Sequence, residues 1–197
     1  MSDMLSVKGL SISFGGLKAV NNFAINIEKG QLYGLIGPNG AGKTTAFNVV
    51  TGVYEPTNGA VHINGLVEIE NYPKGKMATT YKGRHQGDYQ QTIKLTPDKV
   101  TKLGVARTFQ NIRLFGDLSV YDNLLTACQK NITYSLFDGF LRTPNCRRQE
   151  KAARAECDAL LEEMELTTQS GQKASNLPYG MQRKLEIARA LATHPKV

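Results

Sequence analysis

Residues 37–44 read Gly37-Pro38-Asn39-Gly40-Ala41-Gly42-Lys43-Thr44, and they lie between a short apolar segment and the start of an expected helix. This stretch matches the pattern G-x-x-x-x-G-K-[ST] of a phosphate-binding loop. Its glycines let successive backbone N–H groups converge on anionic oxygens at the positive end of a helix. The Lys43 ammonium would reach the β- and γ-phosphates, and the Thr44 hydroxyl would be a ligand for Mg²⁺. A simple glycine-rich turn is the alternative, but the context favours binding of a nucleoside triphosphate.

The segments around this loop predict an α/β domain with antiparallel and parallel strands. Phe23 to Glu28 alternates between apolar and polar residues, which is typical of a half-buried strand. Leu32–Ile36 is apolar on both faces, which predicts a strand inside a sheet that is covered on both sides. Lys43 to Thr51 favours a short helix. Ala60 to Ile63 alternates again, and Asn64-Gly65 is a strong signal for a two-residue hairpin turn.

The second half of the chain is predicted to be mostly helical. Thr96-Pro97-Asp98 indicates a helix start, and Gly104 closes that helix. Val105 to Phe109 is compatible with a strand. Ser119-x-x-Asp122 resembles a capping box at the start of a further helix. The ranges 147–166 and 180–193 have apolar residues at helical spacing and are expected to form two more helices.

Composition limits the class of protein. The 197 residues include 24 Lys and Arg against 17 Asp and Glu, and 41% of them are hydrophobic, which suits one ordinary domain. No apolar run approaches the roughly 18–20 residues that span a bilayer, and residues 1–12 lack the apolar region of a signal peptide. Three cysteines without a C-x-x-C pair indicate neither a disulfide framework nor a zinc site. We therefore expect a reduced cytosolic domain.

The segment between Glu70 and Lys99 is basic and contains tyrosines at positions 72, 81 and 89. Cations interleaved with aromatic rings suit contacts to the phosphates and bases of a nucleic acid. The same composition, rich in Gly, Lys, Gln and Thr, also suits a solvated surface insertion, and a run of mixed charge is usually of that kind.

Three motifs together resemble the ATP-binding subunits of ABC transporters. They are GPNGAGKTT at 37–45, RTFQN at 107–111 and LPYGMQRKLE at 177–186. The resemblance extends from Leu5 to the last residue, except for an insertion at 67–96. It implies a P-loop ABC ATPase core of the α/β class, with an antiparallel β part and a helical subdomain.

The resemblance also implies which residues bind ATP and Mg²⁺. The Phe14 ring would lie against adenine, although a lone aromatic residue is often only part of a core. Gln110 would contact Mg²⁺ and the attacking water as a catalytic residue, although a glutamine in this place is often only a solvated loop residue. The full set of implied ATP contacts is Phe14, Val20, Gly37, Pro38, Asn39, Gly40, Ala41, Gly42, Lys43, Thr44 and Thr45, with Thr44 and Gln110 at the metal.

The third motif departs from the usual Leu-Ser-Gly-Gly-Gln of the family, in which it binds the ATP of an opposed subunit. Pro178, Tyr179 and Met181 replace the Ser, the first Gly and the Gln, while Gly180 is retained. The loss of the hydroxyl at 178 leaves backbone N–H groups and the helix dipole to bind the phosphate. This variant and the stretch TFQNIRLF at 108–115 resemble the branch of the family that imports branched-chain amino acids.

The family continues beyond LATHPKV at 191–197 into an apolar strand that ends in Asp-Glu, and later into a switch histidine. We therefore expect a truncated subunit that does not hydrolyse ATP by itself. The expected organisation is one incomplete domain over 1–197. Its nucleotide-binding core is 1–66 with 105–111, its insertion is 67–96, its helical subdomain is 112–176, and its signature motif and helix are 177–193.

The resemblance implies an ATP-hydrolysing subunit of an importer for branched-chain or similar hydrophobic amino acids. Its partners would be a second ATP-binding subunit, identical or not, two transmembrane permease subunits and, indirectly, an extracytoplasmic solute-binding protein, with no nucleic acid. It would lie in the cytoplasm on the inner face of the cell membrane. Two alternatives stay open: an ABC subunit for another substrate, such as urea or an exported lipid, and a non-transport ABC protein that acts on ribosomes or DNA.

Overall fold

The computed structural model describes residues 3–71 and 96–197. The chain divides into two compact units, Met1–Val105 with Val197, and Ala106–Lys196. Most of the basic insertion lies outside the described residues, so its two interpretations stay predictions.

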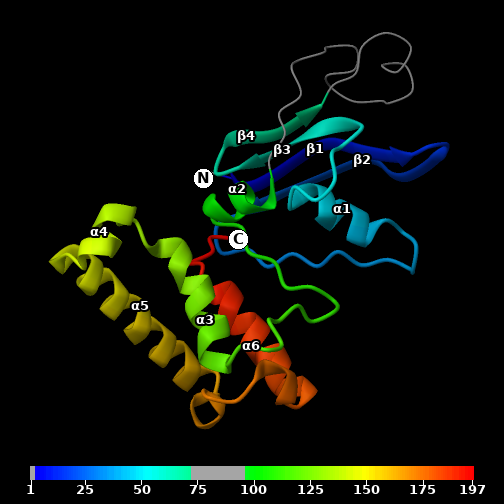
Figure 1. The fold of residues 1–197 in the computed structure, drawn as a ribbon. Coiled ribbons are helices and arrows are strands. Elements are labelled where there is room, and N and C mark those ends of the chain that lie inside the picture. The colour runs from blue at the N-terminus through cyan, green and yellow to red at the C-terminus, as the bar shows by residue number, and fades with distance from the viewer. Residues whose placement is uncertain (1–2, 72–95) are drawn as a thin grey trace. The chain divides into compact units, whose positions relative to one another are not determined.

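The first unit contains an antiparallel sheet with the strand order β2-β1-β3-β4 (Figure 1). The strands are β1 (Asp3–Phe14), β2 (Leu17–Glu28), β3 (Asn58–Ile63) and β4 (Leu66–Asn71). Helices α1 (Lys43–Val50) and α2 (Pro97–Lys102) pack on one face of this sheet through Val49, Val50 and Val100. The helices predicted at Lys43 and at Pro97 are confirmed.

Strand β1 supplies much of the core of this unit, and a bulge keeps its apolar residues on one face. Leu5 and Val7 are buried before the bulge, and Leu10 and Ile12 are buried after it. The pairing register shifts between Val7 and Leu10, where Gly9 has a positive φ of 58°. The extra residue moves the side-chain alternation by one position, so both halves of the strand face the same core.

The hairpin predicted at Asn64-Gly65 is confirmed. It joins β3 to β4, and the φ angles are 51° at Asn64 and 77° at Gly65. Positive φ at both central residues matches the turn that follows the right-handed twist of paired strands, and Asn and Gly tolerate it best.

The strand predicted over Leu32–Ile36 is wrong. Residues 31–38 form no strand, and the exposed fractions of the Leu32 and Ile36 side chains are 100% and 95%. Only Leu35 is half-buried. A strand needs a neighbour that supplies hydrogen bonds, and none of the described strands pairs with this segment. The described sheet therefore contains no parallel part.

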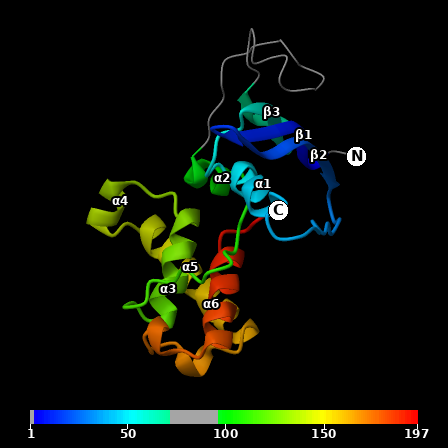
Figure 2. The ribbon, with the colours of Figure 1, turned by 90° about the vertical axis from the view of Figure 1, so that its right-hand side faces the viewer.

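The second unit is helical (Figures 1 and 2). Its helices are α3 (Val120–Cys128), α4 (Leu136–Leu141), α5 (Pro144–Glu163) and α6 (Tyr179–Leu191), with 3₁₀ turns η2 (Gln129–Asn131), η3 (Thr167–Gln169) and η4 (Ala174–Asn176). The buried core comes mainly from α3, α5 and α6: Val120, Leu124, Cys128, Ala153, Cys157, Leu161, Leu166, Ala174, Leu177, Leu185, Ala188 and Ala192.

The helices predicted after Ser119, at 147–166 and at 180–193 are confirmed, with shifted ends. The Ser119 hydroxyl accepts a hydrogen bond from the Asp122 amide and caps α3. Helix α5 begins earlier than predicted, because Thr143 caps it and Pro144 occupies its first position. Helix α6 begins at Tyr179, one residue before the prediction, and it ends at Leu191.

The strand predicted over Val105–Phe109 is wrong, because these residues form no strand. Both backbone groups of Phe109 are bound by side chains of α6 instead of by a neighbouring strand. A sequence pattern cannot reveal such partners, since they lie more than 70 residues away along the chain.

Candidate functional site

The glycine-rich loop ends at the open N-terminus of α1. Gly42 is the N-cap residue, in the left-handed conformation with φ 81°, and no side chain caps the helix. The first backbone N–H groups of a helix have no acceptor within the helix. The N–H groups of Lys43, Thr44 and Thr45 therefore start the helix without a side-chain partner at the cap, which suits an anion.

Only glycine fits at position 42. A Cβ atom there would lie 2.3 Å from the carbonyl oxygen of Ala19 and 3.1 Å from a methyl group of Val20, both in β2. Gly40 has a similar φ of 83°, but a Cβ atom there would meet no atom within 4 Å. The loop thus approaches the backbone of β2 at Gly42 and faces open space at Gly40. This arrangement also brings Val20, an implied ATP contact, next to the loop.

The Lys43 side chain folds back over the loop. Its ammonium donates hydrogen bonds to the carbonyl oxygens of Gly37, at 2.5 Å, and Pro38, at 2.7 Å. The Ala41 amide also donates to the Pro38 carbonyl, at 3.3 Å. The loop therefore surrounds the Lys43 ammonium and leads into the first N–H groups of α1. The exposed Thr44 side chain comes directly after Lys43. The Lys43 ammonium and the N–H groups suit the phosphates of a nucleotide, and the Thr44 hydroxyl can supply one oxygen ligand to a divalent cation.

Phe14, at the end of β1, is half exposed, with an exposed fraction of 48%. Its ring makes an edge-to-face contact with Tyr54, at a centroid distance of 5.4 Å and an interplanar angle of 76°. An exposed ring of this kind has a free surface for stacking, and Phe14 is not part of the buried core. Tyr54 was missed by the sequence analysis, because nothing near it in the chain indicates a partner 40 residues away.

Gln110 belongs to the second compact unit, whereas the glycine-rich loop belongs to the first. Its side chain is exposed, and the residue before it is tightly held. The Phe109 amide donates to the Glu186 carboxylate at 2.9 Å, and the Phe109 carbonyl accepts from the Arg183 guanidinium at 2.5 Å. Arg183 and Glu186 also pair with each other at 2.6 Å. Two neighbouring turns of α6 thus hold the backbone that leads to Gln110.

Other cations of the second unit strengthen this arrangement. The guanidinium groups of Arg107 and Arg113 lie 4.9 and 4.7 Å from the centroid of the Phe109 ring. Burial, and then the charge of Arg113, lower the pKa of Arg107. Arg189 of α6 donates to the Arg113 carbonyl at 2.6 Å. The segment 109–113, which carries Gln110, is therefore attached to α6 at both of its ends.

We expect Glu186→Gln to loosen this segment. The variant keeps the shape of the side chain, but it places a neutral amide against Arg183 and weakens the acceptor for the Phe109 amide. Because the half-buried Phe109 amide would lose its charged acceptor, the free energy of unfolding should fall by about 1–3 kcal/mol. Amide hydrogen exchange at Phe109, together with denaturant unfolding, measures the effect.

The matched control is Glu165→Gln, which removes the charge from an exposed pair with Lys184, where the exposed fractions of the side chains are 79% and 43%. An exposed pair of this kind contributes about 0–1 kcal/mol, so the control should change little. Equal effects of the two variants on Phe109 exchange would contradict the role of Glu186.

The signature residues lie at the start of α6. Pro178 is the N-cap residue, and it makes no side-chain cap hydrogen bond. Pro178, Tyr179 and Gly180 are exposed, and Met181 is half-buried. A phosphate could therefore reach the backbone N–H groups of Tyr179 and Gly180, which would replace the missing hydroxyl as expected.

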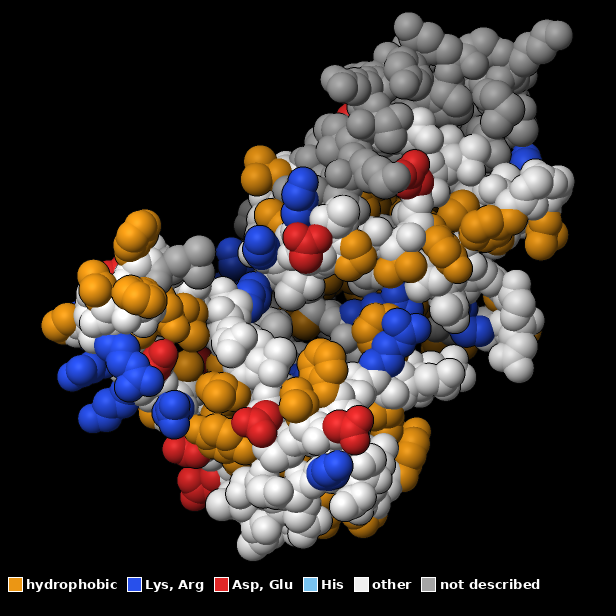
Figure 3. Space-filling model, viewed as in Figure 1, with side chains coloured by type: hydrophobic (Ala, Val, Ile, Leu, Met, Phe, Trp, Pro, Cys, Tyr) orange, Lys and Arg blue, Asp and Glu red, His pale blue; other side chains and the backbone are white. Residues whose placement is uncertain are grey.

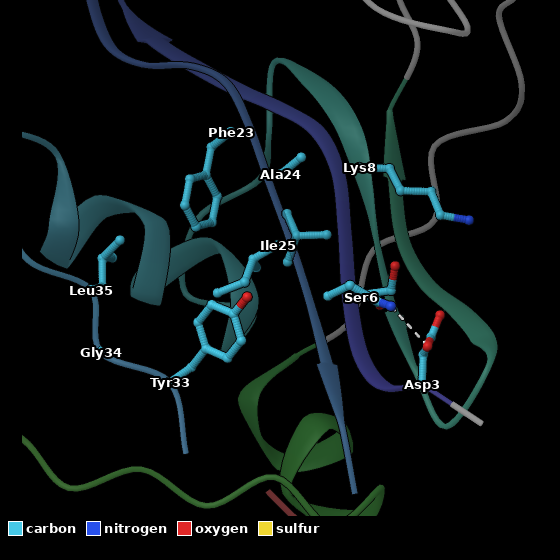
Figure 4. A pocket seen from close by; sticks show the side chains of 11 residues that line it. Asp3, Ser6, Lys8, Phe23, Ala24, Ile25, Tyr33, Gly34 and Leu35 are labelled. Carbon is cyan, nitrogen blue, oxygen red and sulfur yellow. Dashed lines mark hydrogen bonds between the residues drawn. The ribbon is translucent and has the colours of Figure 1, made fainter. Parts of the chain in front are cut away.

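A hollow beside the sheet contains none of these residues (Figure 4). It is lined by β1, β2 and residues 33–35, and Asn26 donates to the Asp3 carboxylate at its rim, at 2.8 Å. The segment 31–38 runs here without pairing with a strand. The hollow therefore belongs to the edge of the sheet and not to the glycine-rich loop.

Comparison with known proteins finds members of one family that match nearly the whole chain. The family model described as ABC transporter matches residues 20–197. BraF of Pseudomonas aeruginosa and LivG of Escherichia coli, both high-affinity branched-chain amino acid transport ATP-binding proteins, are each 39% identical over 194 residues. Each alignment covers 98% of this chain and 67% of the relative. The chain thus spans about two thirds of the length of these relatives.

Two solved structures show the same fold. A nucleotide-free ATP-binding cassette of an ABC transporter superposes with a TM-score of 0.69 at 26% identity, over 99% of this chain and 66% of the other. The ADP conformation of such a cassette superposes with a TM-score of 0.67, at the same identity and coverage. The loop geometry, the family model and these relatives lead to one conclusion: this chain belongs to the ATP-binding subunits of the ABC transporter family.

Proposed function

We propose that this chain is the nucleotide-binding part of an ATP-hydrolysing subunit that drives an importer of branched-chain amino acids. The observation that carries the proposal is the glycine-rich loop, which lies close to β2 at Gly42 and ends at the uncapped start of α1. The names of the relatives BraF and LivG support the substrate class.

In this proposal, the backbone of residues 37–45 surrounds the phosphates, and Lys43 moves from the loop carbonyls to the β- and γ-phosphates. Thr44 and Gln110 would hold Mg²⁺, which would neutralise the charge that develops on the phosphate oxygens. Phe14 would stack on the base, with Tyr54 supporting its ring from the edge.

The signature residues would act on the ATP of a second ATP-binding subunit. Pro178, Tyr179, Gly180 and Met181 would present the N-terminus of α6 to its γ-phosphate. Because α6 also holds Phe109, the signature helix and Gln110 would move together when ATP binds. In this arrangement 1–66 with 105–111 form the core, 112–176 the helical subdomain and 177–193 the signature region.

The proposed partners are two permease subunits in the membrane and, through them, a solute-binding protein. Within residues 3–71 and 96–197, no helix is both long and apolar enough to cross a bilayer. The proposed place of the subunit is the cytoplasmic face of the membrane, where it would meet the permeases. Another transported substrate, such as urea or an exported lipid, would use the same ATP site.

Calorimetric titration of the folded chain with Mg-ATP tests the proposal. Saturable binding, with competition by ADP and no competition by a nucleoside that lacks phosphates, is the expected result. A chain that is folded by circular dichroism and binds no nucleotide would refute it. Salt-sensitive binding of RNA or DNA in a filter assay would instead favour the ribosome- or DNA-acting class.

We expect Phe14→Ala to weaken ATP binding by about 1–3 kcal/mol, which is the contribution of one base stacked on an aromatic ring. The matched control is Tyr33→Ala, which removes an exposed ring from the same unit but from outside the loop. Calorimetry of both variants should show a loss for Phe14→Ala alone. Unchanged affinity in Phe14→Ala would mean that the ring only packs against Tyr54.

A further inference from the structure

Helix α4 has its apolar side chains on the outside. The exposed fractions of Phe137, Phe140 and Leu141 are 79%, 87% and 69%. Phe137 precedes the other two by three and four positions, so the three side chains share one face of the helix. Asp138 and Gly139, by contrast, are half-buried. A helix on the surface of a globular protein normally has the opposite arrangement, with its apolar face toward the core.

Local polar contacts define both ends of α4. Ser135 and Asp138 form a capping box, and the Thr143 hydroxyl donates to the Asp138 carboxylate at 3.1 Å. A Cβ atom on Gly139 would lie 3.3 Å from the Tyr134 ring, so this side of the helix lies close to its neighbour. The apolar side chains are therefore presented by a fixed helix and not by a frayed one.

The helix that follows is strongly polarised in charge. Its first part, 144–154, carries Arg147, Arg148, Lys151 and Arg154 with a single acid, Glu150. Its second part, 155–163, carries Glu156, Asp158, Glu162 and Glu163 and no cation. Helix α5 has no acid in its first turn and no base in its last turn.

This order of charges opposes the stability of α5 itself. The positive end of the helix dipole disfavours cations in the first turn, and the negative end disfavours acids in the last. Arg147 and Lys151 are also four positions apart, where like charges repel. All four cations of the first part are exposed, and Glu150 is engaged by the hydroxyl of Tyr134. Neither the place of Arg147 near the start of α5 nor its spacing to Lys151 stabilises the helix, which suggests that these exposed cations serve a partner.

We propose that the α4–α5 corner, defined as residues 135–154, docks on a membrane surface that contains anionic phospholipid. Phe137, Phe140 and Leu141 would enter the boundary of headgroups and acyl chains, and the arginines would contact the lipid phosphates. Figure 3 shows hydrophobic side chains gathered over α4, beside a group of Lys and Arg side chains. Interfacial helices combine Phe and Leu with neighbouring Lys and Arg in this way.

A lipid surface is favoured over a protein partner because it supplies both kinds of contact at once. The three apolar side chains are largely exposed, so all of them can enter the interfacial layer of a bilayer. Five cations against two acids in the corner match the negative potential of a bilayer that contains anionic lipid. This inference does not depend on the nucleotide site, since all of its residues lie outside the glycine-rich loop and the signature region.

Co-sedimentation of the chain with vesicles tests the proposal. The chain should bind phosphatidylcholine vesicles that contain phosphatidylglycerol, and it should not bind vesicles of phosphatidylcholine alone. Added salt should weaken binding, because it screens the cations. The double variant Arg147→Gln with Arg148→Gln should bind roughly thirtyfold more weakly, since each cation near an anionic surface contributes about fivefold. The double variant Phe137→Ser with Phe140→Ser should lose about tenfold or more.

Two control variants carry matched changes outside the corner. Lys29→Gln with Lys196→Gln removes two exposed charges, and Leu17→Ser with Leu66→Ser removes two exposed apolar side chains. Both controls should bind the vesicles within about twofold of the parent chain, because their cations and side chains lie outside the proposed contact. Unfolding curves should show all four variants folded and none of them strongly destabilised, since the substituted side chains are exposed.

Several results would overturn the proposal: no binding of the parent chain to anionic vesicles, equal binding to both vesicle types, or corner variants that bind as well as the controls. If the Phe137→Ser and Phe140→Ser variant binds vesicles normally but no longer co-purifies with the permease subunits, the corner docks on protein, and the lipid proposal is wrong. ATP affinity, measured on the same variants, should equal that of the parent. A chain that binds anionic vesicles but not ATP would refute the proposed function alone.

Discussion

Replacement of Lys43 by alanine should weaken ATP binding roughly a hundredfold or more, because hydrogen bonds between charged groups are the strongest that the loop can make. The triphosphate would then face only neutral backbone amides. The ammonium now contacts the carbonyl oxygens of Gly37 and Pro38, so its charge already lies at the loop that would hold the phosphates. Calorimetry with Mg-ATP measures the loss.

Two controls separate the charge of Lys43 from its support of the loop. Lys43→Gln keeps a donor for the carbonyls of Gly37 and Pro38 but removes the charge, so it should bind ATP as poorly as Lys43→Ala. Lys29→Ala removes an exposed cation of the same unit and should bind ATP normally. Recovery of affinity in Lys43→Gln would mean that the lysine acts by shaping the loop and not by its charge.

The second large effect is expected at Gly42. In Gly42→Ala, the new Cβ atom would lie 2.3 Å from the Ala19 carbonyl oxygen, in a left-handed conformation with φ 81°. Strain of this kind costs about 1–2 kcal/mol for the conformation alone, and the clash adds to it. We expect the free energy of unfolding to fall by about 2–4 kcal/mol, with the loop displaced from β2. Denaturant unfolding measures the change.

Gly40→Ala is the matched control, because Gly40 has nearly the same φ, 83°, but open space around it. It should lose only the conformational part, about 1–2 kcal/mol. The difference between the two variants then reports the contact between the loop and β2. Equal losses in the free energy of unfolding would show that the close approach of Gly42 to Ala19 adds nothing to the effect of Gly42→Ala.

Local features of the chain were predictable where a few neighbouring residues determine the backbone. The turn at Asn64-Gly65 needs positive φ at both residues, and Asn and Gly accept this conformation at low cost. The helix after Ser119 starts at a cap that Ser and Asp form within four residues. The glycine-rich loop is determined in the same way, since its pattern specifies both the turn and the helix that follows.

Features that depend on a distant partner were not predictable from the sequence. The apolar run Leu32–Ile36 has the composition of a buried strand, yet composition cannot supply a neighbouring strand, and the segment stays exposed. The strand predicted over Val105–Phe109 is wrong for the same reason, because composition cannot supply its neighbouring strand. Its backbone finds partners in Arg183 and Glu186, whose role has no signature near residue 109.

The sequence by itself determined the family, the phosphate-binding loop and most helices, because motifs and caps act over fewer than about ten residues. Only the tertiary structure decided that Gly42 touches β2, that Tyr54 meets Phe14 and that α6 holds the backbone before Gln110. It also decided that Phe137 and Phe140 face solvent. Burial and hydrogen bonding of these groups depend on which distant surfaces meet, and the energy of such contacts is not encoded in any short stretch of chain.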